Sequence, residues 1–112
     1  MKRTLIAIYL AALAFTAPAY ADSFSGKASY YGLKGHTASG SRVGAFTAAH
    51  RSLPFGSKAR VTNLNNNRSV VVTINDRGPF TGGRVIDVSP SAADALGFRS
   101  AGVATVKVEA SR

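Results

Sequence analysis

Hydrophobic and polar residues alternate with a period of two through much of the chain after residue 22, which is typical of short β-strands. The clearest strand covers residues 69–75, where β-branched residues dominate, and it ends in the turn-forming sequence Asn-Asp-Arg-Gly-Pro. Gly78 tolerates a positive φ and Pro79 lacks a backbone N–H, so the strand cannot continue. Residues 58–64 also alternate, and the asparagines at 65–67 tolerate left-handed conformations, which predicts a hairpin between the two strands.

The remaining pattern predicts further short strands and one helix. Residues 24–32, 84–88 and 103–109 are predicted strands, and the apolar residues 46–50 are expected to pack on the core. Ser89 is a candidate N-cap with Pro90 at the first helical position, and Gly97 is expected to end this short helix. Residues 34–44 are rich in Gly, Ser and Thr and predict an exposed loop. Together these elements predict a mainly β domain, either a small barrel or a sandwich.

The N-terminus has the features of an export signal. Lys2 and Arg3 precede an apolar run at residues 5–15, and Ala19-Tyr20-Ala21 is a typical cleavage site. We therefore expect a signal peptide over residues 1–21 and one mature domain over residues 22–112, exported to the periplasm or the extracellular cell-wall space. The apolar run is shorter than the roughly 20 residues that span a bilayer, so we expect no stable membrane anchor. A retained N-terminal anchor is the alternative.

The chain is strongly basic and has no cysteine. Its formal net charge is +9, and removal of Lys2 and Arg3 leaves a positive field that favours anionic polymers. For an exported protein this favours cell-envelope polymers such as peptidoglycan over nucleic acid. His36 and His50 are not spaced like a ligand pair, which argues against a metal site. Phosphate-loop and dinucleotide motifs are absent from the sequence, so no cofactor is expected.

Asp76 and Asp87 are the candidate functional carboxylates. Each lies at the end of a β-branched strand and is followed by turn residues, so strands that converge in a barrel would bring them to one groove. The alternatives are structural: Asp76 would cap its turn and pair with Arg77, and Asp87 would cap Ser89 or the following helix. Several aromatic residues are candidates for stacking on sugars, although more of them are expected in the core: Tyr30, Tyr31, Phe46, Phe55 and Phe80.

Several motifs in their order along the chain resemble one family. They are Ala-Ser-Tyr-Tyr-Gly at 28–32, Thr-Ala-Ser-Gly at 37–40, Thr-Ala-Ala-His-Arg-Ser-Leu-Pro-Phe-Gly at 47–56, Val-Thr-Asn-Leu at 61–64, Ile-Asn-Asp-Arg-Gly-Pro-Phe at 74–80, and Arg-Val-Ile-Asp-Val-Ser at 84–89. The chain closely resembles the RlpA (rare lipoprotein A) family. The resemblance implies a six-stranded double-psi β-barrel, the fold of expansins, and lytic transglycosylase activity on peptidoglycan glycan strands.

The resemblance also implies site residues. Asp76 matches a proposed catalytic carboxylate of the family, and Asp76 with Asp87 matches the acidic pair of bacterial expansin-like barrels. Ser41 stands where many members have a glutamate. The residues expected to bind substrate are Tyr31, Thr37, Ser39, Ser41, His50, Asn75 and Arg77.

A single carboxyl group suffices for the implied reaction. A hydrolase generally needs two carboxyls, whereas a lytic transglycosylase uses the sugar's own 6-hydroxyl as nucleophile. We expect Asp76 to protonate the departing oxygen and then accept the hydroxyl proton. A guanidinium paired with Asp76 would oppose this role by favouring the ionised carboxylate. The alternative function is a non-catalytic, expansin-like module that binds or loosens the wall; in either case we expect a monomer.

Overall fold

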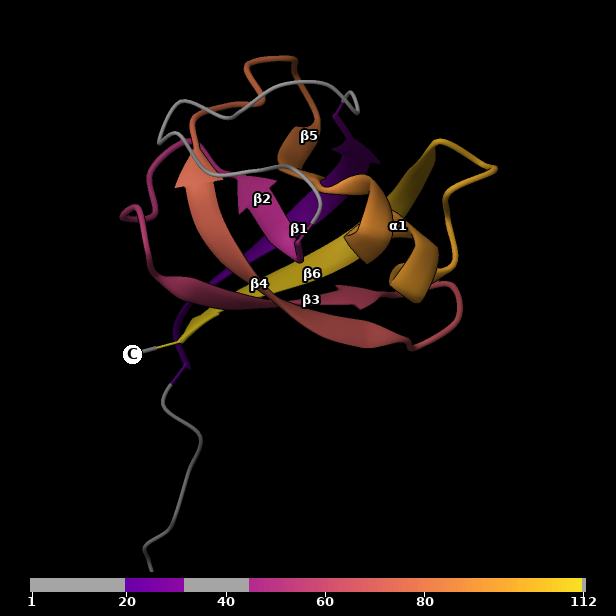
Figure 1. Ribbon diagram of the computed structural model, residues 1–112, viewed down its shortest axis with the longest axis horizontal. Coiled ribbons are helices and arrows are strands. Elements are labelled where there is room, and N and C mark those ends of the chain that lie inside the picture. Colours follow the sequence, from indigo (N-terminus) through magenta and orange to yellow (C-terminus); the bar gives the residue numbers. More distant parts are fainter. Residues whose placement is uncertain (1–19, 32–44, 112) are drawn as a thin grey trace, which may run out of the picture.

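The computed structural model describes residues 20–31 and 45–111, which form a closed β-barrel with one short helix (Figure 1). The strands are β1 (Tyr20–Tyr30), β2 (Thr47–Ala49), β3 (Lys58–Asn63), β4 (Ser69–Asp76), β5 (Arg84–Val88) and β6 (Val103–Ser111), and the helix is α1 (Pro90–Leu96). Their order around the barrel is β1-β5-β2-β4-β3-β6. The expected mainly β fold is confirmed, as a barrel rather than a sandwich.

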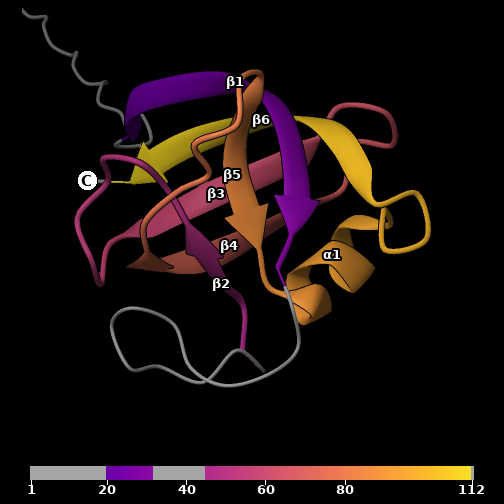
Figure 2. The same ribbon diagram turned by 90° about the horizontal axis from the view of Figure 1, so that it is seen from above.

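Parallel and antiparallel strand pairs are mixed in the barrel. β1 is parallel to β5 and β2 is parallel to β4, while the other neighbours are antiparallel. Parallel pairing needs a crossover between the strands, so segments far apart in the sequence become neighbours. The short β2 thus lies between β4 and β5, as Figure 2 shows from above.

The predicted hairpin is present between β3 and β4. Thr62 pairs with Ser69 at its closed end, and Asn67 adopts a left-handed φ of 62°. The Asn63 side chain accepts a hydrogen bond from the Asn65 N–H and donates one to the Leu96 carbonyl. The asparagine-rich turn therefore also contacts the end of α1.

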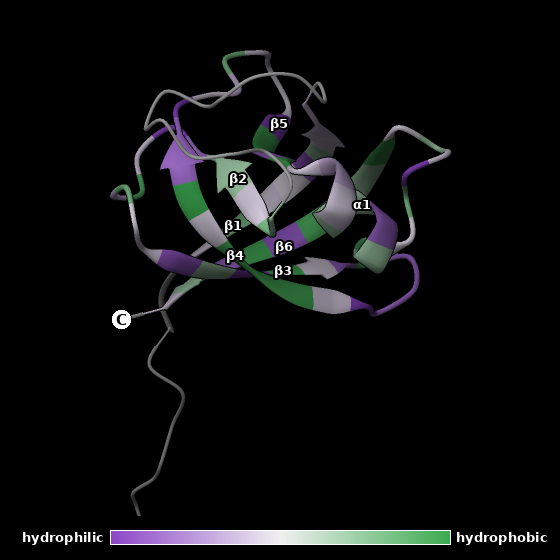
Figure 3. Ribbon diagram, viewed as in Figure 1, coloured by the Kyte–Doolittle hydropathy of each residue, from purple (hydrophilic) through white to green (hydrophobic). Residues whose placement is uncertain are grey.

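The barrel interior is filled by alternate residues of the strands. On β4 the inward side chains include Val72 and Ile74, and the end of this strand becomes hydrophilic (Figure 3). Further fully buried core side chains include Val61, Ile86, Val88, Val106, Val108, Leu96 and Phe98. Burial of each such side chain contributes roughly 1.5–3 kcal/mol.

The helix begins and ends as the sequence predicts. The Ser89 hydroxyl accepts a hydrogen bond from the Ala92 N–H at 3.3 Å, Pro90 starts the helix, and Gly97 ends it with a φ of 79°. Ser89 also exchanges two hydrogen bonds with Thr47: its N–H donates to the Thr47 carbonyl at 2.8 Å, and its hydroxyl accepts from the Thr47 N–H at 3.2 Å. The helix start is therefore joined to β2.

Strands at the two ends of the described chain are longer than predicted. β1 begins at Tyr20 instead of residue 24, and β6 runs to Ser111 instead of residue 109, because the two strands pair from Tyr20 opposite Ser111 as far as Ser29 opposite Val103. Cleavage after Ala21 would remove the first two residues of β1. Residues 1–19 of the expected signal peptide (1–21) and the expected loop at 34–44 lie outside the described residues. Within the described ranges, none of the helices is long and apolar enough to cross a membrane.

Candidate active site

A β-bulge brings Asp76 and Asp87 to the same face of the barrel. Ala48 pairs with Ile74 and Val88, all three in the core, whereas the next residue, Ala49, pairs with both Asp76 and Asp87. Between Ile74 and Asp76 the register shifts by one residue, which reverses the alternation of β4. Paired residues share a face, so both carboxylates flank Ala49. The Cα atoms of Asp76 and Asp87 are therefore two strand spacings of about 4.8 Å apart, or roughly 10 Å.

Ser29 extends this arrangement by one strand. It pairs with Asp87 across β1 and β5, and its hydroxyl donates a hydrogen bond to the Asp87 Oδ1 atom. We call Ser29, Asp87, Ala49 and Asp76 the carboxylate row. The row crosses four adjacent strands, β1, β5, β2 and β4, and contains two small side chains between and beside the acids.

Tyr31 is influenced by both carboxylates. Its hydroxyl is hydrogen-bonded to the Thr47 hydroxyl. Burial raises the pKa of the Tyr31 phenol, the Thr47 hydrogen bond opposes this, and the negative charges of Asp76 and Asp87 raise the pKa further. The phenol therefore stays protonated at neutral pH and can act as a hydrogen-bond donor beside both acids.

The Asp87 carboxylate is held by charged and polar partners. The Nη2 atom of Arg84 lies 3.3 Å from the Asp87 Oδ1 atom, the same oxygen that accepts the hydrogen bond of the Ser29 hydroxyl. Arg51 in turn donates to the Arg84 backbone carbonyl at 2.9 Å. The alternative in which Asp87 caps the helix is wrong, because the Ser89 side chain occupies that position.

Asp76 has a different environment. Its Oδ1 atom accepts a hydrogen bond from the Arg77 backbone N–H at 2.9 Å, so it does cap the turn. The Arg77 guanidinium points elsewhere: its Nη1 donates to the carbonyls of Leu53 at 2.8 Å and His50 at 3.2 Å, and it stacks 4.3 Å from the centre of the Phe55 ring. The side-chain ion pairs among the described residues join Arg84 to Asp87, Arg99 to Asp94 and Lys107 to Glu109. The anticipated pairing of Asp76 with Arg77 is therefore wrong at the level of the side chains.

His50 and Asn75, both expected to bind substrate, are buried. His50 is 3% exposed, and its Nδ1 atom accepts hydrogen bonds from the N–H groups of Ser52 and Leu53. Asn75 is 4% exposed, and both polar atoms of its amide lack a hydrogen-bond partner. The other expected substrate-binding residues, Thr37, Ser39 and Ser41, lie outside the described residues.

The candidate aromatic residues are less buried than expected. Phe80 is 78% exposed, and Phe46 and Phe55 are also exposed. Tyr30 is half-buried, donates its hydroxyl to the Arg99 carbonyl and packs partly on Phe98. The expectation that most of these aromatic residues fill the core is wrong, because Ala, Val and Ile of the strands already fill it.

Sequence reasoning did not identify Ser29, Thr47 and Arg84 as parts of the site. Ser29 and Thr47 reach it only through the pairing of strands far apart in the sequence. Arg84 precedes Asp87 by three residues in a strand, a spacing that regular alternation would place on opposite faces, and the register between β1 and β5 shifts just after Arg84.

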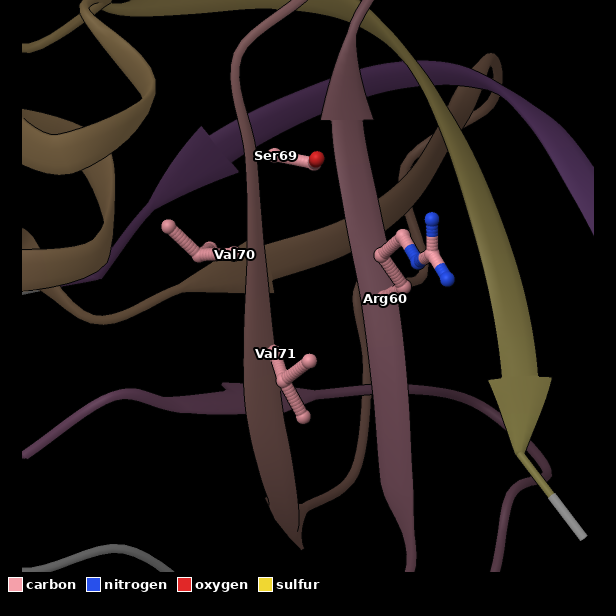
Figure 4. A pocket seen from close by; sticks show the side chains of 4 residues that line it. All are labelled: Arg60, Ser69, Val70 and Val71. Atoms are coloured by element: carbon pink, nitrogen blue, oxygen red, sulfur yellow. The ribbon is translucent and has the colours of Figure 1, made fainter.

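A shallow pocket of about 230 Å³ lies on another part of the barrel. Arg60 of β3 and Ser69, Val70 and Val71 of β4 line it (Figure 4). Val71 precedes Asp76 by five residues, or about 17 Å along an extended strand, so this pocket does not include the carboxylate row. In the part of the chain that the structure describes, His, Cys, Asp and Glu side chains form no group of three that could hold a metal ion.

The comparisons with known proteins agree with this fold. The family model described as "Lytic transglycolase" matches residues 23–108. A probable endolytic peptidoglycan transglycosylase RlpA of Nostoc sp. is 60% identical over 94 residues, which cover 78% of this chain and 25% of that relative. The endolytic peptidoglycan transglycosylase RlpA of Neisseria meningitidis serogroup A is 53% identical over 90 residues, covering 76% of this chain and 38% of that relative.

Solved structures show the same fold at lower identity. The Streptomyces papain inhibitor has a TM-score of 0.67 at 23% identity, with 83% of this chain and 97% of that chain covered. The expansin of Clavibacter michiganensis also has a TM-score of 0.67 at 23% identity, with 81% and 51% covered. The chain spans about a quarter to two fifths of the length of the curated relatives described above. Because the family model matches most of its length, the chain belongs to the RlpA-like family of double-psi β-barrel lytic transglycolases.

Proposed function

We propose that this domain is an endolytic peptidoglycan lytic transglycosylase that cleaves glycan strands, including strands stripped of peptides, and leaves 1,6-anhydro ends. The names of the relatives support this reaction. The observation that carries it is the carboxylate row, in which Asp76 is free of the Arg77 guanidinium and shares a face with the ion-paired Asp87.

In this mechanism Asp76 acts as general acid and then as general base. Its carboxyl proton passes to the glycosidic oxygen as the bond from C1 to that oxygen breaks. The carboxylate then accepts the proton of the sugar's 6-hydroxyl while that oxygen bonds to C1. The reaction consumes no water, and Asp76 recovers its proton at the end of the cycle.

Asp87 and Tyr31 have supporting roles in this proposal. Asp87, held by Arg84 and Ser29, supplies a fixed negative charge for the positive charge that develops at C1 in the transition state. The protonated Tyr31 phenol donates a hydrogen bond to substrate oxygens. Thr37, Ser39 and Ser41 remain proposed substrate contacts, whereas His50, Asn75 and Arg77 support the site from within the fold.

Product analysis tests this function. The chain that begins at Asp22 is incubated with peptide-free glycan strands, and mass spectrometry searches for sugars with 1,6-anhydro ends. Asp76→Asn is expected to reduce their formation by about 10²–10⁴-fold. Wild-type activity in Asp76→Asn would contradict the role of Asp76, and hydrolysed reducing ends in place of 1,6-anhydro ends would contradict the reaction type.

Ser41 supports a second candidate function, because many members of the family have a glutamate at this position. In that case the domain is a non-catalytic, expansin-like module that binds or loosens peptidoglycan. Co-sedimentation with sacculi without any 1,6-anhydro product would favour this function over the enzyme.

We further propose export to the periplasm or cell-wall space and a monomeric state. Mass spectrometry of the secreted protein should give an N-terminus at Asp22, and light scattering should give the mass of one chain. An intact Met1 or a dimer mass would contradict these two proposals.

A further inference from the structure

We propose that His50 is a positioning residue, which holds the 50–53 loop closed and thereby keeps the Arg77 guanidinium away from the Asp76 carboxylate. The inference rests on the proposed role of Asp76 as acid and base. His50 contacts no reacting atom in this proposal, since its side chain is buried and its hydrogen bonds go to the loop.

The His50 imidazole closes the loop by accepting two hydrogen bonds. The backbone N–H groups of Ser52 and Leu53 lie 3.1 Å and 3.2 Å from its Nδ1 atom. An asparagine side chain bonds the N–H groups two and three residues ahead in the same way at turns and helix starts. Because Nδ1 is an acceptor, the neutral ring carries its proton on Nε2.

The closed loop presents two carbonyl groups to Arg77. Nη1 of Arg77 donates to both the His50 and the Leu53 carbonyls, which lie three residues apart and converge only while the loop is closed. The His50 N–H also donates to the Asp76 carbonyl at 3.1 Å, which continues the pairing of β2 with β4 up to the acid. The loop is therefore attached to both Asp76 and Arg77.

Opening of the loop would release the Arg77 guanidinium, which would then be free to approach the carboxylate of Asp76, the preceding residue. A guanidinium within about 4–6 Å stabilises an ionised carboxylate, and an ionised carboxylate cannot protonate the leaving oxygen. His50 is thus connected to the chemistry of Asp76 through Arg77, although it is separated from the reacting atoms.

Protonation of His50 is incompatible with the closed loop, because Nδ1–H would face two N–H donors. Burial lowers the pKa of His50, and the positive charges of Arg51 in the loop and Arg77 on the β4 side lower it further. Phe24 of β1 packs its uncharged ring against the His50 ring, with 4.7 Å between the ring centres. Asp76 contacts His50 through its backbone carbonyl, which accepts the His50 N–H. An opened loop takes up the proton near pH 6.5 and the closed loop only at lower pH, so closure weakens as pH falls through this window.

His50→Asn and His50→Leu separate positioning from simple packing. Asparagine keeps an acceptor for the Ser52 and Leu53 N–H groups but does not titrate, whereas leucine fills space without an acceptor. At pH 7 we expect His50→Asn to keep kcat within about threefold of wild type and His50→Leu to lose about tenfold or more, with KM within about twofold. Below pH 6.5 the ratio of kcat for His50→Asn to that of wild type should rise as the pH is lowered. His36→Asn removes the other histidine and is the control: the ratio of its kcat to that of wild type should not change with pH.

Amide hydrogen exchange reports the loop without any reference to activity. The Ser52 and Leu53 amides should be protected in wild type and His50→Asn at pH 7 and exposed in His50→Leu, while amides of β3 stay protected in all three. Wild-type kcat in His50→Leu, or a flat pH ratio for His50→Asn, would overturn the positioning role. Failure of every variant and of wild type to form 1,6-anhydro product, with the exchange pattern intact, would overturn the proposed function instead.

Discussion

The two acids of the carboxylate row differ in the groups that hold them. Asp87 is ion-paired with Arg84 and hydrogen-bonded to Ser29, whereas Asp76 receives a backbone N–H from Arg77. The sequence predicted both acids, because each ends a β-branched strand before a turn. Their partners were not predictable, because a side-chain rotamer decides whether Arg77 bonds its neighbour or the carbonyls of the 50–53 loop.

Asp87→Asn tests the fixed negative charge. The substitution keeps the shape and the acceptor for Ser29 but leaves the half-buried Arg84 without its ionic partner. We expect a loss of kcat of about 10–100-fold and a loss of stability of about 1–3 kcal/mol, measured by product formation and urea unfolding. Asp94→Asn, which breaks the more exposed pair with Arg99, is the control and should change either quantity little. Equal effects of the two substitutions would contradict a special role for Asp87.

Phe80 is a residue whose exposure has no structural explanation, and we expect its ring to stack on a sugar near the Asp76 turn. The free energy of unfolding of Phe80→Ala should be within about 0.5 kcal/mol of the wild-type value, because the ring is 78% exposed. Its KM on glycan strands should rise about 2–10-fold, since ring contacts contribute about 0.5–1.5 kcal/mol, and Phe80→Tyr should retain the wild-type value. An unchanged KM in Phe80→Ala would exclude the contact.

At the scale of elements, the short strand β2 and the bulge in β4 assemble the site. Sequence patterns predicted most strands and the helix, since alternation and caps are local signals. They indicated only apolar packing for β2, because three small residues carry no periodic signal. The bulge at Asn75 was not predictable either, since it depends on pairing with β2, and without it alternation would turn Asp76 toward the core.

Ser89→Ala tests the connection between α1 and β2. The substitution removes the N-cap and leaves the Thr47 N–H, which is in the barrel wall, without its side-chain acceptor. We expect a loss of about 1–3 kcal/mol in the free energy of unfolding, from the cap and the lost buried hydrogen bond. Ser100→Ala, at an exposed position, should stay within about 0.5 kcal/mol. Urea unfolding, monitored by circular dichroism, measures the stability of both variants. Equal unfolding midpoints for Ser89→Ala and Ser100→Ala would refute the connection between α1 and β2.

At the scale of the whole molecule, a basic chain carries its two candidate acids on a single face. The formal net charge of +9 includes Lys2 and Arg3, which export would remove. The long-range field is positive with or without these two residues and favours anionic polymers, while the two candidate acids place negative charge in the row. In the proposed function, attraction to the wall and cleavage of the sugar bond thus depend on different groups.

The separation of these two roles has a measurable consequence. Affinity of the Asp76→Asn variant for sacculi should fall several-fold between about 50 and 300 mM NaCl, because surface charges farther apart than about 6–14 Å become screened over this range. Sacculi with amidated carboxylates should bind more weakly and lose most of this salt dependence. The amide of Asp76→Asn carries no negative charge, so the affinity of this variant at low salt should equal or exceed that of the wild-type protein. Co-sedimentation across the salt series measures all three quantities. Binding that is independent of salt on untreated sacculi would show that the contacts of the row, and not the positive field, bring this domain to its polymer.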